Sequence, residues 1–319
     1  MLPNDIATAS GVEAGSIPRS AARDTLYRRR VRPVDGLLHT LLCMSAGLTV
    51  LLLAGILGYV VVRGIPVIDW SFLSTGYSMR NNTDGILPYL INTLYIVVIT
   101  LLITTPIGVG GAIYLNEYAS RGRLVRLIEA TIEILAGIPS IIYGLFGMVV
   151  FGSIVYGYEN GKPLTLGYSI LTGCLTLAIL VLPILIRTTQ EALKTVPTSY
   201  REGAMGIGAT KWYMIRTILL PSAMPGILTG IILSIGRIVG ESAALIFTAG
   251  SGYDLPKEGL MGAASHVMDS SATLTVKMYL AANEGYNDTA FGAALVLVVL
   301  VLIINALTKV VSRRVGNKA

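Results

Sequence analysis

The sequence predicts an all-α membrane protein with six transmembrane helices and both termini in the cytoplasm. Hydrophobic residues make up 53% of the 319 residues and charged residues only 13%, with a mean hydropathy of +0.70, whereas about a quarter of the residues of a soluble protein are charged. Apolar runs long enough to cross a bilayer recur along nearly the whole chain. If successive runs cross the membrane in alternating directions, the segments on one side of the membrane contain eighteen Lys and Arg residues and those on the other side contain five. The positive-inside bias therefore places the richer side, with both termini, in the cytoplasm.

Four segments follow from this pattern. They are a cytoplasmic N-terminal tail, a first span with its outer loop, a core, and a cytoplasmic C-terminal tail, at residues 1–33, 34–86, 87–308 and 309–319. The first tail carries an arginine cluster around Arg29. The first span, Leu37–Val62, is too long for the apolar region of a signal peptide, which has about 7–15 residues. Trp70 in the following loop suits the membrane–water interface on the outer side of the membrane.

The core holds the other five predicted spans. The second span carries Pro106 and several glycines, which favour close packing and a kink. The third is entered through an amphipathic stretch that begins at Leu127. The outer segment before the last span has roughly forty residues and predicts a short helix of its own. The five spans and that short helix are expected at 88–114, about 137–156, 167–186, 223–247, 289–307 and 273–282.

A polar stretch between the fourth and fifth spans, Tyr200–Pro221, has an unusual spacing of residues. Glu202, Gly203 and Ala204 can lie on a short helix, and Gly208 permits the positive φ that ends one. A second helix would place Ala209, Trp212, Ile215 and Ile218/Leu219 on one face, with Leu220 beside them and Pro221 marking a break before the fifth span. Physical chemistry alone allows this to be an amphipathic helix on the membrane surface or a docking loop for a partner.

Two charge pairs stand out in or beside the predicted spans. Arg237 and Glu241 are four residues apart inside the fifth span, where charges are costly and pair with each other. The pair either contacts an anion in transit or fixes helix packing together with the small-residue pairs Gly226/Gly230 and Gly236/Gly240. Arg187 and Glu191 form a second candidate pair at the inner mouth, where an arginine at the end of a span is common.

Several other kinds of site are excluded or disfavoured. Cys43 and Cys174 fall in apolar runs, so they predict neither a disulfide nor a metal site. His39 and His266 are each isolated in the sequence, and neither belongs to a recognisable catalytic set. The Gly157–Pro163 stretch lacks the spacing of a phosphate-cradling ATPase loop, so no cofactor is expected in this chain. The positive charge is explained by topology and does not predict a nucleic-acid partner.

The loop and four other motifs carry a family resemblance. The Glu-x-Ala, Gly and Ile-x-Leu-Pro spacing of residues 202–221 resembles the EAA loop of ATP-binding-cassette (ABC) import permeases. The chain also resembles the A-type permeases of phosphate-specific ABC importers at Asn92–Leu94, Gly137–Gly147, Gly236–Leu245 and Thr248–Gly250. It departs from the family pattern at Gly203, where alanine is usual, and at Gln190, where an acid is usual.

The resemblance implies a type I ABC importer permease fold with an EAA coupling loop at residues 189–221. It implies a non-catalytic subunit of a phosphate importer, in a bacterial or archaeal cytoplasmic membrane, with a homologous second permease, two ABC ATPase subunits and an extracytoplasmic phosphate-binding protein as partners. For Arg237 and Glu241, the resemblance favours a role in the substrate path over a role in helix packing. Arg187 is a further candidate for the substrate path. The alternatives are an ABC permease for another oxyanion or small solute, and a secondary anion transporter that needs no ATPase.

Overall fold

The computed structural model describes residues 33–78, 83–120, 122–155, 158–159, 162–163, 167–256 and 259–316. The helices are α2 (Pro33–Gly64), α3 (Trp70–Ser74), α4 (Leu87–Ile113), α5 (Arg123–Gly137), α6 (Ser140–Val155), α7 (Ile170–Lys194), α8 (Thr198–Gly206), α9 (Lys211–Met214), α10 (Leu220–Val239), α11 (Ala243–Thr248), α12 (Gly259–His266), α13 (Leu274–Asn283) and α14 (Asn287–Gly316). A 3-10 turn, η1 (Ile65–Val67), follows α2, and two π-helical turns, η2 (Tyr114–Tyr118) and η3 (Ile215–Leu219), extend α4 and precede α10. Two short hairpins pair β1 (Tyr77–Ser78) with β2 (Thr83–Asp84) and β3 (Tyr158–Glu159) with β4 (Lys162–Pro163).

The prediction of a mostly helical membrane protein is confirmed. Five helices of the described chain are long and apolar enough to cross a bilayer, at Gly36–Val67, Leu87–Tyr118, Ile170–Lys194, Lys211–Val239 and Asn287–Val310. A sixth span exists only if a bent pair of helices is counted as one. The count of six and the orientation of the termini therefore stay predictions, and the arginine cluster around Arg29 lies outside the described residues.

The third predicted span is that bent pair. Helices α5 and α6 meet at an angle of 107°. Ile138 is extended, with φ −72° and ψ 132°, because the ring of Pro139 disfavours helical backbone in the residue before it. The amphipathic lead-in is thus a separate helix, α5, and α6 alone has 16 residues. An α-helix rises 1.5 Å per residue, so α6 falls short of the roughly 20 residues that a bilayer requires.

The fourth and fifth spans also differ from the prediction. Helix α7 continues to Lys194, so Arg187 lies inside a helix and does not open the inner loop. Pro221 marks no break, because the helical run continues from Lys211 to Val239. Pro221, which has no N–H to donate, lies in the first turn of α10, directly after the π-helical turn η3. In that turn the Leu220 N–H bonds to Ile215 O, one residue further back than in an α-helix. The predicted end of this span is wrong as well, since α10 stops at Val239 and Gly240 caps it.

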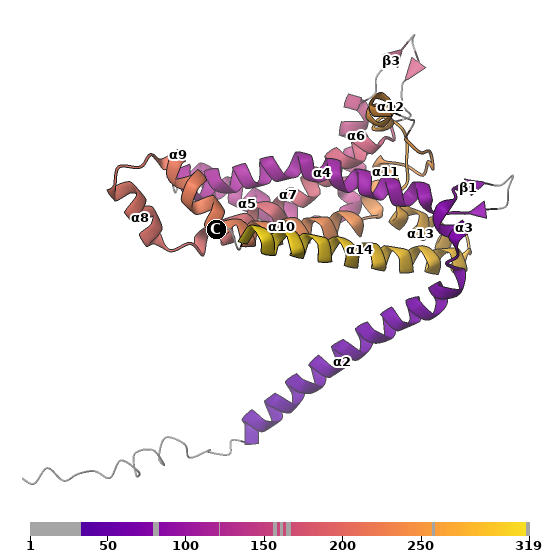
Figure 1. Ribbon diagram of the computed structural model, residues 1–319, viewed down its shortest axis with the longest axis horizontal. Coiled ribbons are helices and arrows are strands. Elements are labelled where there is room, and N and C mark those ends of the chain that lie inside the picture. Colours follow the sequence, from indigo (N-terminus) through magenta and orange to yellow (C-terminus); the bar gives the residue numbers. More distant parts are fainter. Residues whose placement is uncertain are drawn as a thin grey trace, which may run out of the picture. The chain divides into compact units, whose positions relative to one another are not determined.

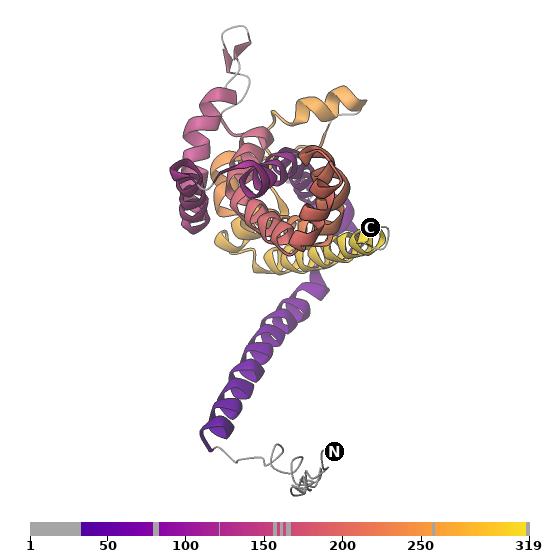
Figure 2. The ribbon, with the colours of Figure 1, turned by 90° about the vertical axis from the view of Figure 1, so that its left-hand side faces the viewer.

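The second unit of the chain, from Gly58 onward, contains a helical bundle. Helices α4, α7, α10 and α14 lie side by side along their length (Figure 1). Figure 2 shows α5 and α6 at one side of this bundle and α14 at another. The main core is apolar and includes Ile96, Leu177, Val181, Ile238 and Leu245. The last turns of α2 belong to this unit and pack on α14, where a Cβ added to Gly64 would lie 2.8 Å from Leu295 Cβ.

The first unit, Met1–Leu57, contributes only its part of α2 to the described chain. Its apolar side chains are exposed, as for Leu42 and Leu51, which suits a helix surrounded by lipid. Helix α11 lies almost wholly within the predicted fifth span, and the predicted outer segment 248–288 contains α12 and α13. The predicted helix at 273–282 is confirmed by α13, whose first turn is capped by Thr273 Oγ1 accepting from Val276 N–H.

Candidate functional site

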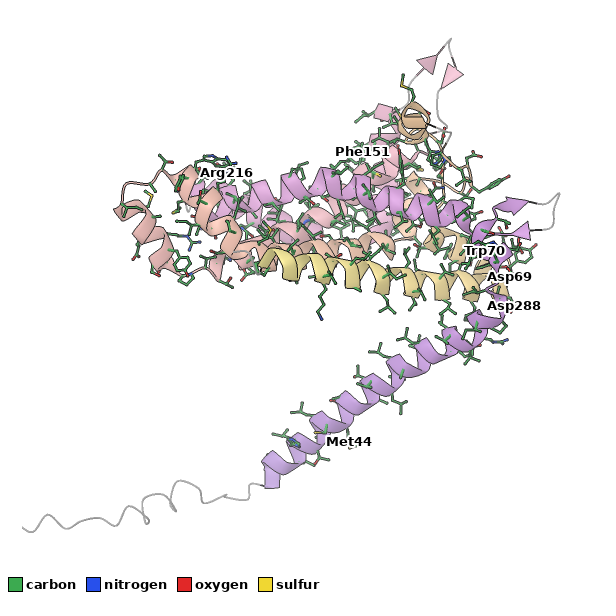
Figure 3. The ribbon with its side chains drawn as sticks, in the orientation of Figure 1. Met44, Asp69, Trp70, Phe151, Arg216 and Asp288 are labelled. Carbon is green, nitrogen blue, oxygen red and sulfur yellow. The ribbon has the colours of Figure 1, made fainter. Side chains whose placement is uncertain are left out.

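The predicted helix–turn–helix of the polar loop is present at one end of the bundle. Helix α8 ends at Gly206, and Gly208 has φ +83°, the left-handed conformation that its sequence position predicted. The turn is closed by the N–H of Gly208 donating to Met205 O at 3.0 Å and that of Ala209 donating to Ala204 O at 3.0 Å. In Figure 3, Arg216 marks this end of the bundle, while Asp69, Trp70 and Asp288 mark the opposite end.

Helix α8 has one buried face and one open face. Ala204 is buried, whereas Glu202 and Gly203 are exposed. A Cβ added to Gly203 would meet nothing within 4 Å, so the departure from the usual alanine costs no contact inside this chain. The loop that carries Glu202 also exposes large apolar side chains on α8, in the turn after it and on α9, and we call this set the loop face: Tyr200, Met205, Ile207, Trp212 and Tyr213.

The predicted packing of the second helix is partly wrong. Trp212 is exposed, whereas Met214, Ile215 and Leu219 are buried in a small core beside α7 and Ala204. The buried side of this helix is that of Met214 and Ile215, and Trp212 in α9 falls outside it. Ile218 and Leu220 pack partly buried against the same core.

Arg237 and Glu241 are brought together as predicted, but across a helix end. Arg237 Nη2 lies 3.3 Å from Glu241 Oε2. Glu241 is 4% exposed and its Oε1 accepts from Ala244 N–H of α11 at 3.2 Å, while the Arg237 side chain is 45% exposed. The carboxylate is therefore fixed by the start of α11, and the guanidinium reaches from the end of α10 into open space.

The two small-residue pairs of α10 behave differently. A Cβ on Gly226 would collide with Ala192 of α7, and one on Gly230 would collide with Thr188 of the same helix. A Cβ on Gly236, beside Arg237, would meet nothing within 4 Å. Only the first pair packs within this chain, so Gly236 and its exposed neighbours Leu233, Arg237 and Gly240 form an open strip on α10, named the α10 strip below.

The predicted Arg187–Glu191 pair is not formed. Arg187 Nη2 lies 3.9 Å from Glu133 Oε2 of α5, and Glu191 instead accepts a bond of 2.9 Å from Lys194 Nζ. Arg187 is 47% exposed and Glu133 is 75% exposed, so this ion pair is weak. On α7, Glu191 has Arg187 four residues before it and Lys194 three residues after it, both within reach on the helix surface, and it pairs with Lys194.

Sequence reasoning missed two polar clusters. At the loop end, Arg201 forms an ion pair with Glu117 of η2 at 2.9 Å. At the opposite end, His266 is buried, with Nε2 3.0 Å from Asn92 Oδ1 and Nδ1 3.0 Å from Asp269 Oδ2. The statement that His266 is isolated is therefore wrong. The contact with Asp269 could have been predicted from the sequence, because Asp269 follows His266 by three residues. The contact with Asn92 could not, because it joins residues 174 apart.

The Asn92–Leu94 motif gains a structural explanation from this cluster. Asn92 Nδ2 also donates to Asp254 O at 3.3 Å, and Thr93 Oγ1 accepts from Leu274 N–H at 2.9 Å. These bonds attach the segment between α11 and α14 to the first turns of α4. Within the described part of the chain, no group of three or more His, Cys, Asp or Glu residues is placed to hold a metal ion. Much of the Gly157–Pro163 stretch lies outside the described residues.

The comparisons with known proteins agree with this arrangement. Residues 105–317 match the family described as "Binding-protein-dependent transport system inner membrane component". The chain belongs to this family. As a permease it is 37% identical over 207 residues to the "Probable ABC transporter permease protein YqgI" of Bacillus subtilis, covering 65% of this chain and 67% of that protein.

Two further matches extend over more of the permease. It is 34% identical over 260 residues to the "Phosphate transport system permease protein PstA" of Haemophilus influenzae, covering 81% of this chain and 86% of that protein. A crystal structure of a bacterial alginate ABC transporter contains a chain with a TM-score of 0.64 and 18% identity, covering 89% of this chain and 96% of that one. The fold is therefore that of an ABC transporter permease, and the chain is a multi-pass membrane protein.

Proposed function

We propose that this chain is the transmembrane permease subunit of an ATP-driven importer of inorganic phosphate. It forms half of the translocation path with a homologous second permease, in a bacterial or archaeal cytoplasmic membrane. Two ABC ATPase subunits and an extracytoplasmic phosphate-binding protein complete the complex. Similarity to PstA over 81% of the chain supports phosphate as the substrate. ATP is hydrolysed in the partner subunits, and this chain carries no cofactor.

The observation that carries the proposal is the loop face. An exposed acidic side chain, Glu202, and several large exposed apolar side chains share one helix–turn–helix, which packs on the bundle through Ala204, Met214 and Ile215. A surface that combines exposed apolar side chains with a charge is typical of a protein interface, since apolar area supplies affinity and the charge supplies orientation. The membrane-surface alternative fits less well, because Glu202 is an acid among the apolar residues and a membrane-binding helix carries basic residues on its polar face.

Arg237 is the proposed contact for the anion. A charged side chain at this depth in a membrane protein faces a bundle interior or a water-filled path. Its guanidinium is nearly half exposed on the α10 strip, and Glu241 is its ion-pair partner among the residues that the structure describes. An arginine offers five N–H donors in a planar fork that matches phosphate, so donors beyond the Glu241 contact are available to an ion. Glu241 stays bound to α11 and orients the guanidinium when the path is empty.

Arg187 is proposed as a second cationic contact nearer the loop end. Its exposed pairing with Glu133 is weak, so an anion can displace the carboxylate at little cost. Two arginines at different depths act as successive weak sites, which allow an ion to enter and leave. Selection of phosphate then occurs in the binding protein, and the permease supplies passage.

The cycle is alternating access. Closure of the two ATPase subunits on ATP moves the grooves that hold α8 of each permease, and the bundle opens towards the loaded binding protein. Hydrolysis releases the ATPase subunits and returns the bundle to its inward-open state. This chain contributes the loop face that is moved and the arginines that the ion passes.

Uptake of radiolabelled phosphate tests the proposal. Cells with and without this chain are compared at low external phosphate, with sulfate and molybdate as competitors. Chain-dependent uptake that resists both competitors is expected. Uptake of another oxyanion instead would favour the first alternative, an ABC permease with a different substrate. Phosphate uptake that is unchanged by Glu202→Arg would favour the second alternative, a transporter that needs no ATPase.

A further inference from the structure

The ion pair between Arg201 and Glu117 joins three elements at the loop end of the bundle. Arg201 Nε and Nη2 donate to Glu117 Oε1 at 3.2 and 2.9 Å. Arg201 Nη1 donates to Val196 O at 2.9 Å, and Nη2 also donates to Leu193 O at 2.9 Å. One guanidinium on α8 thus binds η2, which extends α4. It also binds one carbonyl in the last turn of α7 and one just beyond that helix. We call this set of contacts the α8 fork.

The fork is sheltered from water. The Glu117 side chain is 6% exposed and that of Arg201 is 22% exposed. The carboxylate also accepts a bond of 2.7 Å from Asn116 Nδ2. The two carbonyls would otherwise lack helical partners, because they lie at or beyond the C-terminal turn of α7. A charge pair with these hydrogen bonds has a defined geometry, and removing either partner leaves the other charge uncompensated.

Helix α8 depends on this fork for its attachment. Arg201 and Ala204 are three residues apart, hence on one face of the helix, and they are its only residues that are not exposed. Ala204 contributes a small apolar contact, whereas Arg201 contributes directed bonds to two other helices. A second contact reaches the same π-helical turn, because Lys211 Nζ lies 5.0 Å from the centre of the Tyr118 ring.

We propose that Arg201 is a positioning residue that makes α8 move with the inner ends of α4 and α7. The inference rests on the proposed function, in which an ATPase subunit displaces α8. Because Glu202 and Gly203 of α8 are exposed while Arg201 and Ala204 of the same short helix are packed, a displacement received at the exposed residues is passed to α4 through Glu117 and to α7 through its carbonyls. Without the fork, α8 would tilt about its short connections, and the spans would not follow it.

Transport per ATP hydrolysed is the first measurement. Complexes with Arg201→Gln, with Glu117→Gln and with both changes are reconstituted in liposomes. Arg126→Gln on α5, where the arginine is exposed, is the matched control. We expect each fork variant to retain its ATPase subunits and its ATP hydrolysis while phosphate carried per ATP falls about tenfold, within the usual range of coupling between sites. The double variant should be no worse than either single one, because the two residues act as a unit.

A distance measurement tests the same inference without activity. Spin labels are placed at Ser199 on α8 and Tyr114 on η2, both exposed, after exposed Cys43 is changed to serine. In the otherwise unchanged complex, one narrow distance distribution should persist with and without a non-hydrolysable ATP analogue. With Arg201→Gln the distribution should shift or broaden when the analogue binds. Arg201→Lys, which keeps a charge for Glu117 but lacks the fork, should be intermediate.

The outcomes separate the two proposals. If the unchanged complex couples normally and Arg201→Gln changes neither phosphate per ATP nor the label distances, the fork is only a structural contact and the inference is wrong. If the unchanged complex hydrolyses ATP without carrying phosphate, the substrate is wrong and the distance measurement still decides the role of Arg201. If the unchanged chain binds no ATPase subunit, the inference falls together with the proposed function.

Discussion

The two glycines Gly226 and Gly236 allow one substitution to be compared in two environments of the same helix. A Cβ at Gly226 would collide with Ala192 Cβ of α7 and lie 3.2 Å from its Cα, so neither a side-chain rotation nor a small shift relieves the contact. A Cβ at Gly236 would meet nothing within 4 Å. We therefore predict that Gly226→Ala destabilises the bundle and Gly236→Ala does not.

The magnitude follows from the difference between the two variants. Each gains about 1 kcal/mol from replacing glycine in a helix interior, and this term cancels in the comparison. Overpacking at the α7–α10 contact costs about 1–3 kcal/mol. For a chain of a few hundred residues, about 2–4 °C corresponds to each kcal/mol, so Gly226→Ala should unfold about 2–12 °C below Gly236→Ala.

Thermal unfolding of both purified variants in the same detergent measures this difference. Membrane proteins often unfold irreversibly, so the apparent Tm values are compared at one scan rate. Equal Tm values, or a higher Tm for Gly226→Ala, would refute the assignment of Gly226 to a close helix contact. The two halves of α10 would then not differ in packing as described, with Gly226 in close contact with α7 and Gly236 open.

The remaining predictions concern function. Glu202→Arg should leave the chain inserted but weaken its binding to the ATPase by about 2 kcal/mol or more, roughly thirtyfold, because it reverses a charge in the loop face; co-purification of the ATPase at full stoichiometry would contradict this. Arg237→Gln should abolish phosphate uptake with assembly intact and Arg237→Lys should retain part of it, since lysine keeps the charge without the fork; normal uptake by Arg237→Gln would return the pair to a packing role. Gly236→Leu should lower uptake without lowering the Tm, because its side chain extends over the α10 strip, and a lowered Tm would show hidden packing there. Arg187→Gln should reduce uptake less than Arg237→Gln, and an equal loss would make the two sites equivalent.

Much of the architecture was predictable because it depends on local patterns. Long apolar runs located five of the spans, and Gly208 marked the turn after α8. The i, i+4 spacing of Arg237 and Glu241 gave their contact correctly even though the helix ends between them. Side chains four residues apart remain neighbours when a single turn is distorted, so this prediction tolerated an error in the secondary structure.

The errors have two physical causes. The first is a change of backbone geometry that a constant period cannot represent, as at η3, after which the helix continues through Pro221, and at Pro139, which bent the third span. The second is contact between residues far apart in sequence. Arg201 and Glu117 are separated by 84 residues, so no local pattern links them. Glu202, the residue after Arg201, could be predicted because the spacing that identifies it lies within residues 202–221.

The packing of this chain distinguishes residues that are satisfied within it from residues that are not. Asn92 and His266 are buried, the α8 fork is largely sheltered, and all of them are bonded inside the chain, so these contacts hold elements together at the two ends of the bundle. The loop face and the α10 strip keep large apolar or charged side chains exposed. Exposed apolar or charged surfaces of this kind mark interaction sites, and the proposed function assigns the loop face to a partner and the α10 strip to the substrate. The fork joins the two classes, because the helix that presents the loop face is fixed to the bundle mainly through Arg201.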